Sequence, residues 1–477
     1  MLFNSFSFAV FLPVTFTLYW ILPHKYRWVF LLFASYFFYM CWNPAYIFLI
    51  ILTTVISWLS ALFIDNSSDR KRCKGILAIT VILCLGILFV FKYFNFFFAS
   101  LASILHFFSI PFSPVVADLI LPVGISFYTF QTMSYVIDVY RGKVRAEKHF
   151  GYYATFISFF PQLVAGPIER ADHLLPQIKE EHVFDYQLAS YGLKQMAWGY
   201  FKKMAIADTL AVYVGSVFSN PMDYQGMPLL IAVFGFLIQI YCDFSGYSDI
   251  AIGTAKLFGI QLVDNFRSPY FSTSIKEFWK RWHISLSEWM RDYVYIPLGG
   301  NRVGTIRRNM NLLITFTVCG LWHGANWTYV IWGGIHGVGQ MIENALPDFK
   351  NKDRVPIRIL RVCVVFCFCA FAQLFFASNS VGDAIYILTH MFVGIGDPVS
   401  YLQGGMHTNL SWESIRCLIV SVLLLGIFDY ASLKCDVIKK ISLMKRGIRW
   451  SIYSAFVVWL LMNVQITDNA QFVYFQF

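Results

Sequence analysis

Charged side chains are scarce in this sequence. Only 13% of its 477 residues are Asp, Glu, Lys or Arg, whereas soluble domains carry about 25%. Because 58% of the residues are hydrophobic, the composition excludes an ordinary soluble domain and predicts a polytopic membrane protein surrounded by membrane lipid. The net charge of +10 would suit nucleic acid, but the basic residues lie in short loops between apolar runs, as the positive-inside rule expects. We therefore predict no nucleic-acid partner.

Several sequence features of ligand-binding proteins are also missing. The ten cysteines form no C-x-x-C pair, and no His/Cys spacing typical of a metal site is present, so we predict no metal. The sequence has no glycine-rich nucleotide loop and no repeat with a period of about 20–50 residues. Residues 1–20 have neither a basic start nor an A-x-A cleavage site, which predicts a first membrane span rather than a removable signal peptide.

Apolar runs separated by turn residues and basic loops extend along the chain. They predict one all-α, polytopic integral membrane domain of about 11–13 transmembrane and re-entrant helices. We divide this domain into N-terminal spans, a catalytic core, C-terminal spans and an external aromatic tail, which are residues 1–150, 151–345, 346–464 and 465–477.

The basic loops predict the orientation of the chain in the membrane. The loops expected on the cytoplasmic side are residues 65–75, 141–149, 347–361 and 434–449. Basic residues are retained on the cytoplasmic side. The number of spans predicted between these loops is consistent with all of them lying on that side. Both termini are then external, and we expect a multi-pass protein of the cytoplasmic (inner) membrane.

Carboxylates occur inside one long apolar run, residues 229–258. Ionisable groups inside a membrane span are costly, and they usually serve a function. The alternative is an internal salt bridge to a base such as Lys256 or Arg267. We favour the salt bridge for Asp249, while both interpretations stay open for Asp243.

Two histidines stand out in the stretch from residue 276 to residue 337. His283 lies in RWHIS and His323 in LWHGAN, and each follows a tryptophan. A buried imidazole is costly in an apolar environment unless it is paired or functional. Histidine is also the usual side chain for taking a proton from a hydroxyl group near neutral pH. Either histidine alone could be a structural residue between helices, but two of them favour a function.

The surroundings of the two histidines differ. Lys276 to Tyr293 contains no glycine or proline and predicts one continuous helix. One face of this helix is polar and carries Glu277, Arg281, Glu288 and Asp292. It is too charged to span lipid, so we expect it at the cytoplasmic interface or along an internal cavity. Gly320 and Gly324 flank Trp322-His323 and permit a kink or a close approach to a ligand.

These motifs carry a resemblance to a known family. RWHISLSEWMRDYVYIPLGGNR followed by LWHGANWTYVIWGGIHG is similar to the signature of the membrane-bound O-acyltransferase (MBOAT) family, in its bacterial alginate O-acetyltransferase-like subgroup. LPVGISFYTFQTMSYVIDVYRG and FPQLVAGPIER also resemble that subgroup. The resemblance implies helices around a central catalytic tunnel, with His323 as the catalytic residue and His283 as the second essential polar position. It also implies a donor thioester on the cytoplasmic side and an acceptor on the far side.

The C-terminus is rich in aromatic residues and has no charge among its last six residues, FVYFQF. An aromatic anchor at the membrane interface is one interpretation. The tail also resembles the C-terminal FxYF-type motif of related acyltransferases and of the small partner peptide of the D-alanyl transfer system. That resemblance implies that Tyr474 carries the acyl group between enzyme and acceptor, and both interpretations stay open.

Together these features predict an acetyltransferase. It would use acetyl-CoA as donor substrate to O-acetylate an extracellular or periplasmic polysaccharide, such as an alginate-like exopolysaccharide, cellulose or peptidoglycan, directly or through a secreted or periplasmic acetyltransferase partner. Acyl transfer needs a base and groups that hold the oxyanion. His323 would be the base for the Tyr474 hydroxyl, and His283, or a group near it, would orient the thioester or donate to its oxygen. The basic residues expected to hold the phosphates of CoA, unless they only follow the positive-inside rule, are Lys280, Arg281, Arg307 and Arg308.

Two alternatives stay open. One is D-alanyl or other acyl transfer to a cell-envelope polymer. The other is a transporter or flippase for a polar substrate, since intramembrane His and Asp and broken helices also suit transport. An inverted internal repeat would favour transport, and none is visible in the sequence.

Overall fold

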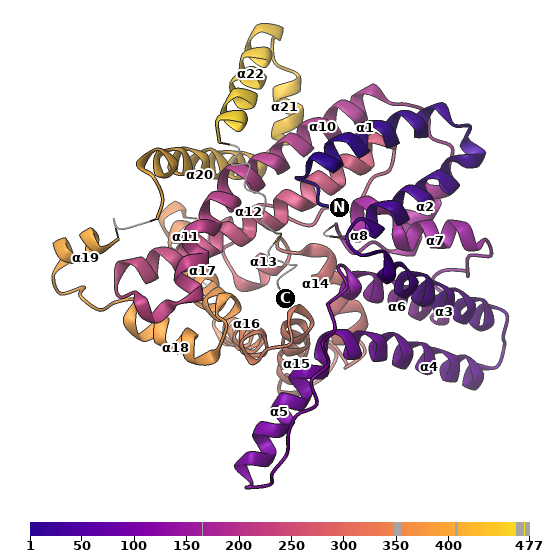
Figure 1. The fold of residues 1–477 in the computed structure, drawn as a ribbon, viewed down its shortest axis with the longest axis horizontal. Coiled ribbons are helices and arrows are strands. Elements are labelled where there is room, and N and C mark those ends of the chain that lie inside the picture. The colour runs from indigo at the N-terminus through magenta and orange to yellow at the C-terminus, as the bar shows by residue number, and fades with distance from the viewer. Residues whose placement is uncertain (165, 348–353, 406–408, 464–471, 473–477) are drawn as a thin grey trace. The chain divides into compact units, whose positions relative to one another are not determined.

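The structure is a computed structural model that describes residues 1–164, 166–347, 354–405, 409–463 and 472. Within these ranges the chain forms twenty-two α-helices and no β-strand, which confirms the predicted all-α class (Figure 1). Five helical stretches are long and apolar enough to cross a membrane, namely Pro44–Asp65, Arg70–Phe107, Met227–Leu257, Val355–Ala377 and Trp412–Ser432. The chain is therefore a multi-pass membrane protein, as predicted. Many of the remaining helices are much shorter than a span.

The chain divides into two compact units. Unit 1 comprises Met1–Leu193 and Ile250–Val263, and unit 2 comprises Lys194–Asp249 and Asp264–Phe477. The predicted boundaries at residues 150, 345 and 464 stay a prediction.

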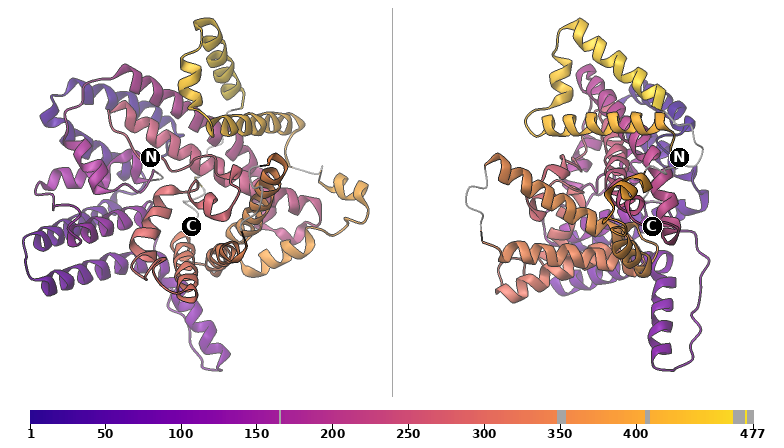
Figure 2. Two further views of the ribbon diagram at one scale, coloured as in Figure 1. Left: turned by 180° about the vertical axis from the view of Figure 1, so that it is seen from behind. Right: turned by 90° about the vertical axis from the view of Figure 1, so that its left-hand side faces the viewer.

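Unit 1 contains two of the candidate spans together with several shorter helices, and aromatic contacts join them. Its helices are α1 (Phe6–Ile21), α2 (His24–Met40), α3 (Ile47–Asp65), α4 (Arg70–Leu88), α5 (Phe94–Phe107), α6 (Ile125–Tyr140), α7 (Phe150–Ser158), α8 (Phe160–Leu163), α9 (Ala171–Lys179) and the first half of α10 (Tyr186–Tyr200). Helices α3 and α4 lie side by side (Figures 1 and 2). Ser57 and Tyr153 join α3 to α7 through a buried hydroxyl–hydroxyl bond of 2.7 Å, so the polar groups of this core are paired internally.

Unit 2 holds both histidine motifs. Its helices are α11 (Asp208–Ser219), most of α12 (Met227–Leu257), α13 (Ile275–Trp279), α14 (Ile284–Met290), α15 (Thr305–His323), α16 (Trp327–Ala345), α17 (Val355–Ala377), α18 (Val381–His390), α19 (Pro398–Gly404), α20 (Trp412–Ser432), α21 (Val437–Ser442) and α22 (Arg446–Asn463). Helices α15 and α16 pack side by side (Figure 1). A Cβ atom at Gly320 or at Gly333 would overlap the backbone of the other helix. These two glycines therefore permit a helix–helix approach that a larger residue would prevent.

The predicted continuous helix from Lys276 to Tyr293 is wrong. The chain breaks after α13, and His283 adopts a left-handed backbone conformation with φ of +44° before α14 begins. The cause is a long-range interaction: the N–H of Ile284 donates to the carbonyl of Asn265 (3.0 Å), and the N–H of Arg267 donates to the carbonyl of Arg281 (2.9 Å). These bonds to a distant segment replace hydrogen bonds within the helix. The helix therefore breaks although this stretch contains no glycine or proline.

A cluster of buried charges lies where α12 meets a π-helical turn, Phe201–Ala207, that follows α10. Lys202 lies 2.5 Å from Asp249, and Lys203 lies 2.6 Å from Asp243 and 2.8 Å from Asp208. Asp249 therefore does form the predicted internal salt bridge, although its partner is Lys202. The expected partners lie elsewhere, since Arg267 pairs with Asp264 and Lys256 packs over the ring of Tyr191.

The buried cluster predicts a large loss of stability when its central cation is removed. Lys203→Met leaves two buried carboxylates without their shared cation, and we expect the free energy of unfolding to fall by about 3–5 kcal/mol. Arg267→Gln is the control: it removes an exposed ion pair, and it should change stability by less than about 1 kcal/mol. Thermal unfolding of the purified protein in detergent measures both effects. Equal melting temperatures of the two variants would contradict the prediction.

Candidate active site

The structure brings the two predicted histidines together. Both imidazoles are buried in unit 2, and their ring centroids lie 6.3 Å apart. His323 is the last residue of α15, because Gly324 continues in an extended conformation and Asn326 then caps α16 by accepting a bond from the N–H of Thr328. His283 lies at the break between α13 and α14.

Aromatic side chains enclose both imidazoles. The ring of His323 lies 4.9 Å from that of Trp322, 5.0 Å from that of Trp332 and 5.3 Å from that of Phe376. The ring of His283 lies edge-on to Phe244 at 4.6 Å. Such surroundings exclude water, and they strengthen every hydrogen bond and charge interaction formed by a reacting group.

Asn265 fixes the proton position on His283. The Oδ1 atom of Asn265 accepts from the backbone N–H of Ser285 (3.2 Å) and from its Oγ hydroxyl (2.9 Å), which identifies it as the amide oxygen. His283 Nδ1 lies 3.2 Å from the same oxygen and must therefore donate to it. Burial lowers the pKa of His283, which lies outside the five candidate spans, to about 3. The imidazole is then neutral, and its Nε2 atom is an acceptor.

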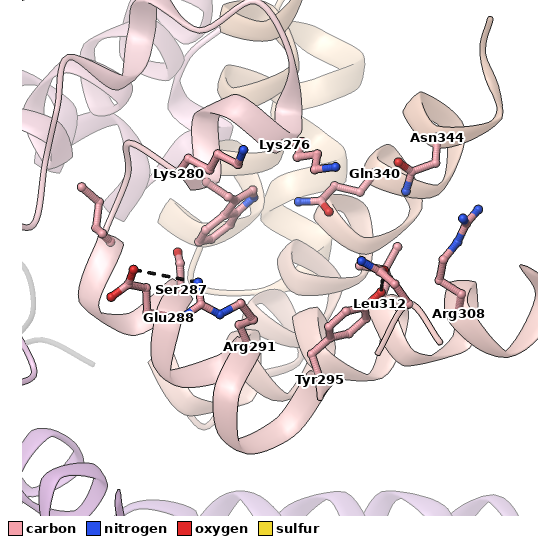
Figure 3. Close-up of a pocket in the computed structure, with 13 residues that line it drawn as sticks. Lys276, Lys280, Ser287, Glu288, Arg291, Tyr295, Arg308, Leu312, Gln340 and Asn344 are labelled. Atoms are coloured by element: carbon pink, nitrogen blue, oxygen red, sulfur yellow. Dashed lines mark hydrogen bonds and ion pairs between the residues drawn. The ribbon is translucent and has the colours of Figure 1, made fainter. Parts of the chain in front are cut away.

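A polar cavity of about 540 Å³ opens in the same unit, between α13, α14, α15 and α16 (Figure 3). Its charged lining residues are the basic Lys276, Lys280, Arg291 and Arg308 and the acidic Glu288, which lies 3.9 Å from Arg291. Its uncharged polar ones include Gln340 and Asn344. Figure 3 shows Lys276, Lys280 and Gln340 on one side of the cavity, with Arg291 and Tyr295 opposite. An anion with several negative charges would fit this lining.

Of the four residues predicted to hold phosphates, two line this cavity. They are Lys280 and Arg308. The other two are engaged elsewhere: Arg281 forms an ion pair of 2.6 Å with Glu277, and Arg307 lies 3.5 Å from the carbonyl of Leu298. Lys276 and Arg291 complete the basic lining, and nothing in the sequence distinguished them from other basic residues near the cytoplasmic loops.

A third histidine, which the sequence interpretation did not single out, connects this cavity with His323. The indole N–H of Trp279, a lining residue, donates to Nδ1 of His336 at 3.2 Å. The His336 ring lies 4.9 Å from that of Trp332, which in turn lies 5.0 Å from that of His323. The available signal was spacing, since His336 follows Trp332 by one helical turn in the same motif.

The third predicted catalytic residue, Tyr474, lies outside the described residues. Phe472, two positions before it, is described and is fully buried. Its ring lies 4.3 Å from that of Tyr247 and 5.9 Å from that of Phe244, the residue in contact with His283. At Phe472 the aromatic tail therefore packs inside unit 2.

No three His, Cys, Asp or Glu side chains of the described ranges lie close enough together to hold a metal ion. The imidazoles can transfer a proton, and aromatic and basic groups near them can bind a substrate.

Known proteins match this chain over most of its length. The family model of MBOAT, the membrane-bound O-acyltransferase family, matches residues 144–377, which include all three histidines. The probable alginate O-acetylase AlgI of Azotobacter vinelandii is 39% identical over 433 residues, 90% of this chain and 85% of that protein. A peptidoglycan O-acetyltransferase of Helicobacter pylori is 35% identical over 427 residues, 82% of this chain and 80% of that protein. A teichoic acid D-alanyltransferase of Streptococcus thermophilus is 32% identical over 252 residues, 49% of this chain and 60% of that protein.

The buried position of His323 predicts a specific loss of function. His323→Ala removes the base, and we expect the rate of acyl transfer to fall by about 100-fold or more, since a general base contributes about 10²–10⁴. Release of CoA from acetyl-CoA by detergent-purified protein measures this rate. His106→Ala, which changes an exposed histidine of α5, is the control. A normal rate in a well-folded His323→Ala variant would refute the assignment.

Proposed function

The chain belongs to the membrane-bound O-acyltransferase family and is an O-acyltransferase, and from this premise we propose that it moves an acetyl group from cytoplasmic acetyl-CoA across the membrane to a polysaccharide outside the cytoplasm. The observation that carries the proposal is the pair of buried imidazoles connected through aromatic side chains to a basic cavity. Relatives named as O-acetylases or O-acetyltransferases are 35% to 44% identical to this chain, whereas the D-alanyltransferases are 28% and 32% identical, which favours acetyl over D-alanyl. The transporter alternative receives no support from these relatives.

The proposed acceptor polymer is a cell-envelope or exopolysaccharide, the class that the names of the relatives contain. The protein would reside in the cytoplasmic membrane with both termini external. The basic loops 65–75 and 434–449 would then be cytoplasmic, where CoA is available.

His323 would act as the general base. Its imidazole takes the proton of the acceptor hydroxyl while the hydroxyl oxygen attacks the thioester carbon. A C–O bond forms, and the two carbonyl π electrons move onto the carbonyl oxygen. When they return, the C–S bond breaks, and the proton passes from His323 to the sulfur of CoA. Neutral His283, held by Asn265, would position the reacting groups through its Nε2 acceptor.

The basic cavity would bind the phosphates of CoA. Lys276, Lys280, Arg291 and Arg308 line it, and guanidinium and ammonium groups are the usual protein partners of phosphate. Lys280 and Arg308 thereby keep the role proposed from the sequence. Lys276 is added to the role, while Arg281 and Arg307 are assigned to structural contacts and Arg291 is already paired with Asp292 at 2.8 Å.

This assignment predicts an effect on substrate binding. Lys280→Gln and Arg308→Gln each remove one phosphate partner, and we expect the KM for acetyl-CoA to rise about tenfold, because a charge-assisted hydrogen bond contributes about 1.5–3 kcal/mol. Initial rates at varied acetyl-CoA concentration measure it. Arg307→Gln is the matched control on the same helix and should leave KM unchanged. A rise in KM for Arg307→Gln alone would place the phosphates elsewhere.

Tyr474 would relay the acetyl group to the outside. The deep position of Phe472 beside Tyr247 supports this role, because it brings the tail into the unit that holds His323. A phenol has a pKa of about 10 and is a poor nucleophile until a base takes its proton. The acetyl ester of Tyr474 would next be attacked by a hydroxyl of the polysaccharide or of a secreted partner, and the phenol would regain its proton.

One experiment tests both the relay by Tyr474 and the proposed acetyl transfer from acetyl-CoA. Incubation of purified protein with acetyl-CoA labelled in its acetyl group should release CoA and leave label on the chain. Tyr474→Phe keeps the ring and removes the hydroxyl, so the label on the chain should disappear. Tyr453→Phe is the control, since this tyrosine belongs to α22 and has no role in the proposal. CoA release with normal acetylation of an added polysaccharide by Tyr474→Phe would exclude the relay, whereas no CoA release by the unaltered protein would exclude acetyl-CoA as donor.

A further inference from the structure

Acyl transfer requires hydrogen-bond donors for the oxygen that becomes negative when the thioester is attacked. His283 cannot supply one, because its Nδ1 proton is donated to Asn265 and its neutral Nε2 atom is an acceptor. Of the two roles expected for His283, orienting the thioester and donating to its oxygen, this geometry favours the first. The donors must therefore come from other residues close to His323.

Two buried N–H groups on α16 have no acceptor among the described residues. One is Nε1 of Trp332 and the other is Nε2 of His336, and both side chains are 1% exposed. The indole nitrogen of tryptophan can only donate a hydrogen bond. Because Trp279 donates to Nδ1 of His336, that nitrogen is an acceptor and the proton of the neutral ring resides on Nε2. Both groups are consequently donors.

Trp332 and His336 lie close to the groups proposed to react. Trp332 and His336 are one turn apart on α16, with ring centroids 4.9 Å apart, and the Trp332 ring contacts that of His323 at 5.0 Å. One turn beyond His336 stands Gln340, which lines the basic cavity. This face of α16 therefore runs from the proposed phosphate site to the base, over a rise of about 12 Å from Gln340 to Trp332.

We propose that Trp332 Nε1–H and His336 Nε2–H are the donors that hold the carbonyl oxygen of the acyl thioester and stabilise the oxyanion formed from it. This inference rests on the proposed function. The hydroxyl oxygen attacks the thioester carbon, and the carbonyl electron pair moves onto the oxygen that both N–H groups would hold. Its return expels the CoA sulfur, which takes the proton from His323. Buried donors without protein acceptors are costly, and hydrogen bonds to the substrate oxygen would offset that cost.

Asn265 Nδ2 is another buried donor without an acceptor in the described part of the chain. It belongs to the side chain bonded to His283, whereas Trp332 contacts His323 directly. A donor for the oxyanion has to lie within about 3 Å of that oxygen. The contact with the base therefore favours the α16 pair.

Conservative substitutions separate the contribution of the two hydrogen bonds to the reaction rate from that of side-chain packing. Trp332→Phe keeps an aromatic ring against His323 and removes the N–H. His336→Asn keeps an acceptor near the position of Nδ1 and loses the donor at Nε2, whereas His336→Gln places an amide N–H near the position of Nε2. Trp327→Phe is the matched control, because it removes the indole N–H of an exposed tryptophan on the same helix.

The measurement is steady-state release of CoA from acetyl-CoA, with size-exclusion profiles and melting temperatures of every variant. We expect Trp332→Phe and His336→Asn to lower kcat about 100-fold with little change in KM, because removal of one oxyanion donor costs about 10²–10³ in kcat. His336→Gln should recover most of the loss, and Trp327→Phe should match the unaltered protein.

The outcomes distinguish this inference from the function on which it rests. Full kcat in folded Trp332→Phe and His336→Asn, with active unaltered protein, overturns the donor pair alone. A raised KM at unchanged kcat also overturns it, since the groups would then bind the ground state only. Equal losses in His336→Gln and His336→Asn would assign His336 to packing. Unaltered protein that releases no CoA overturns the proposed function and the inference with it.

Discussion

The close approach of α15 and α16 is the constraint on which the rest of the site depends. At Gly320 the space of a Cβ atom is filled by the carbonyl of Tyr329, and at Gly333 by the carbonyl of Phe316. Because neither helix can move away without losing this packing, the last residue of α15 is held against Trp332 of α16. The base is thus positioned by backbone contact between two helices, and the side chains around it need little freedom to adjust.

A second constraint is that polar groups inside an apolar unit need partners. His283 adopts a left-handed conformation that costs about 1–3 kcal/mol for a residue other than glycine. Asn265 offsets this cost by accepting three hydrogen bonds, from His283 and from two groups of Ser285. Lys203 forms ion pairs with Asp208 and Asp243 and so offsets the cost of burying their charges. The N–H groups of Trp332 and His336 have no acceptor among the described residues, and beside His323 they indicate a place for a ligand.

The class of the protein and its two motif histidines were predictable, because composition and local motifs are properties of short stretches. The break at His283 was not, since it depends on hydrogen bonds to Asn265, a residue in a different segment. The partner of Asp249 was missed for a similar reason: Lys202 follows α10, far from Asp249 in sequence. Arg281 looked equivalent to Lys280 in the sequence, but the ion pair with Glu277 engages its charge. The first two failures concern which distant residue a side chain meets, whereas Glu277 lies only four positions from Arg281.

The arrangement also explains how a charged donor can serve a reaction inside an apolar enclosure. If the phosphates of CoA occupy the basic cavity, their charges stay beside Lys280 and Arg308, while the neutral thioester alone follows the face of α16 toward His323. The acceptor then has to arrive by another route, because this one is filled by the donor. Phe472 lies beside Phe244, which contacts His283, and none of these three residues lines the cavity. Only the acetyl group would then change compartment, and neither CoA nor a polysaccharide would need to cross the membrane.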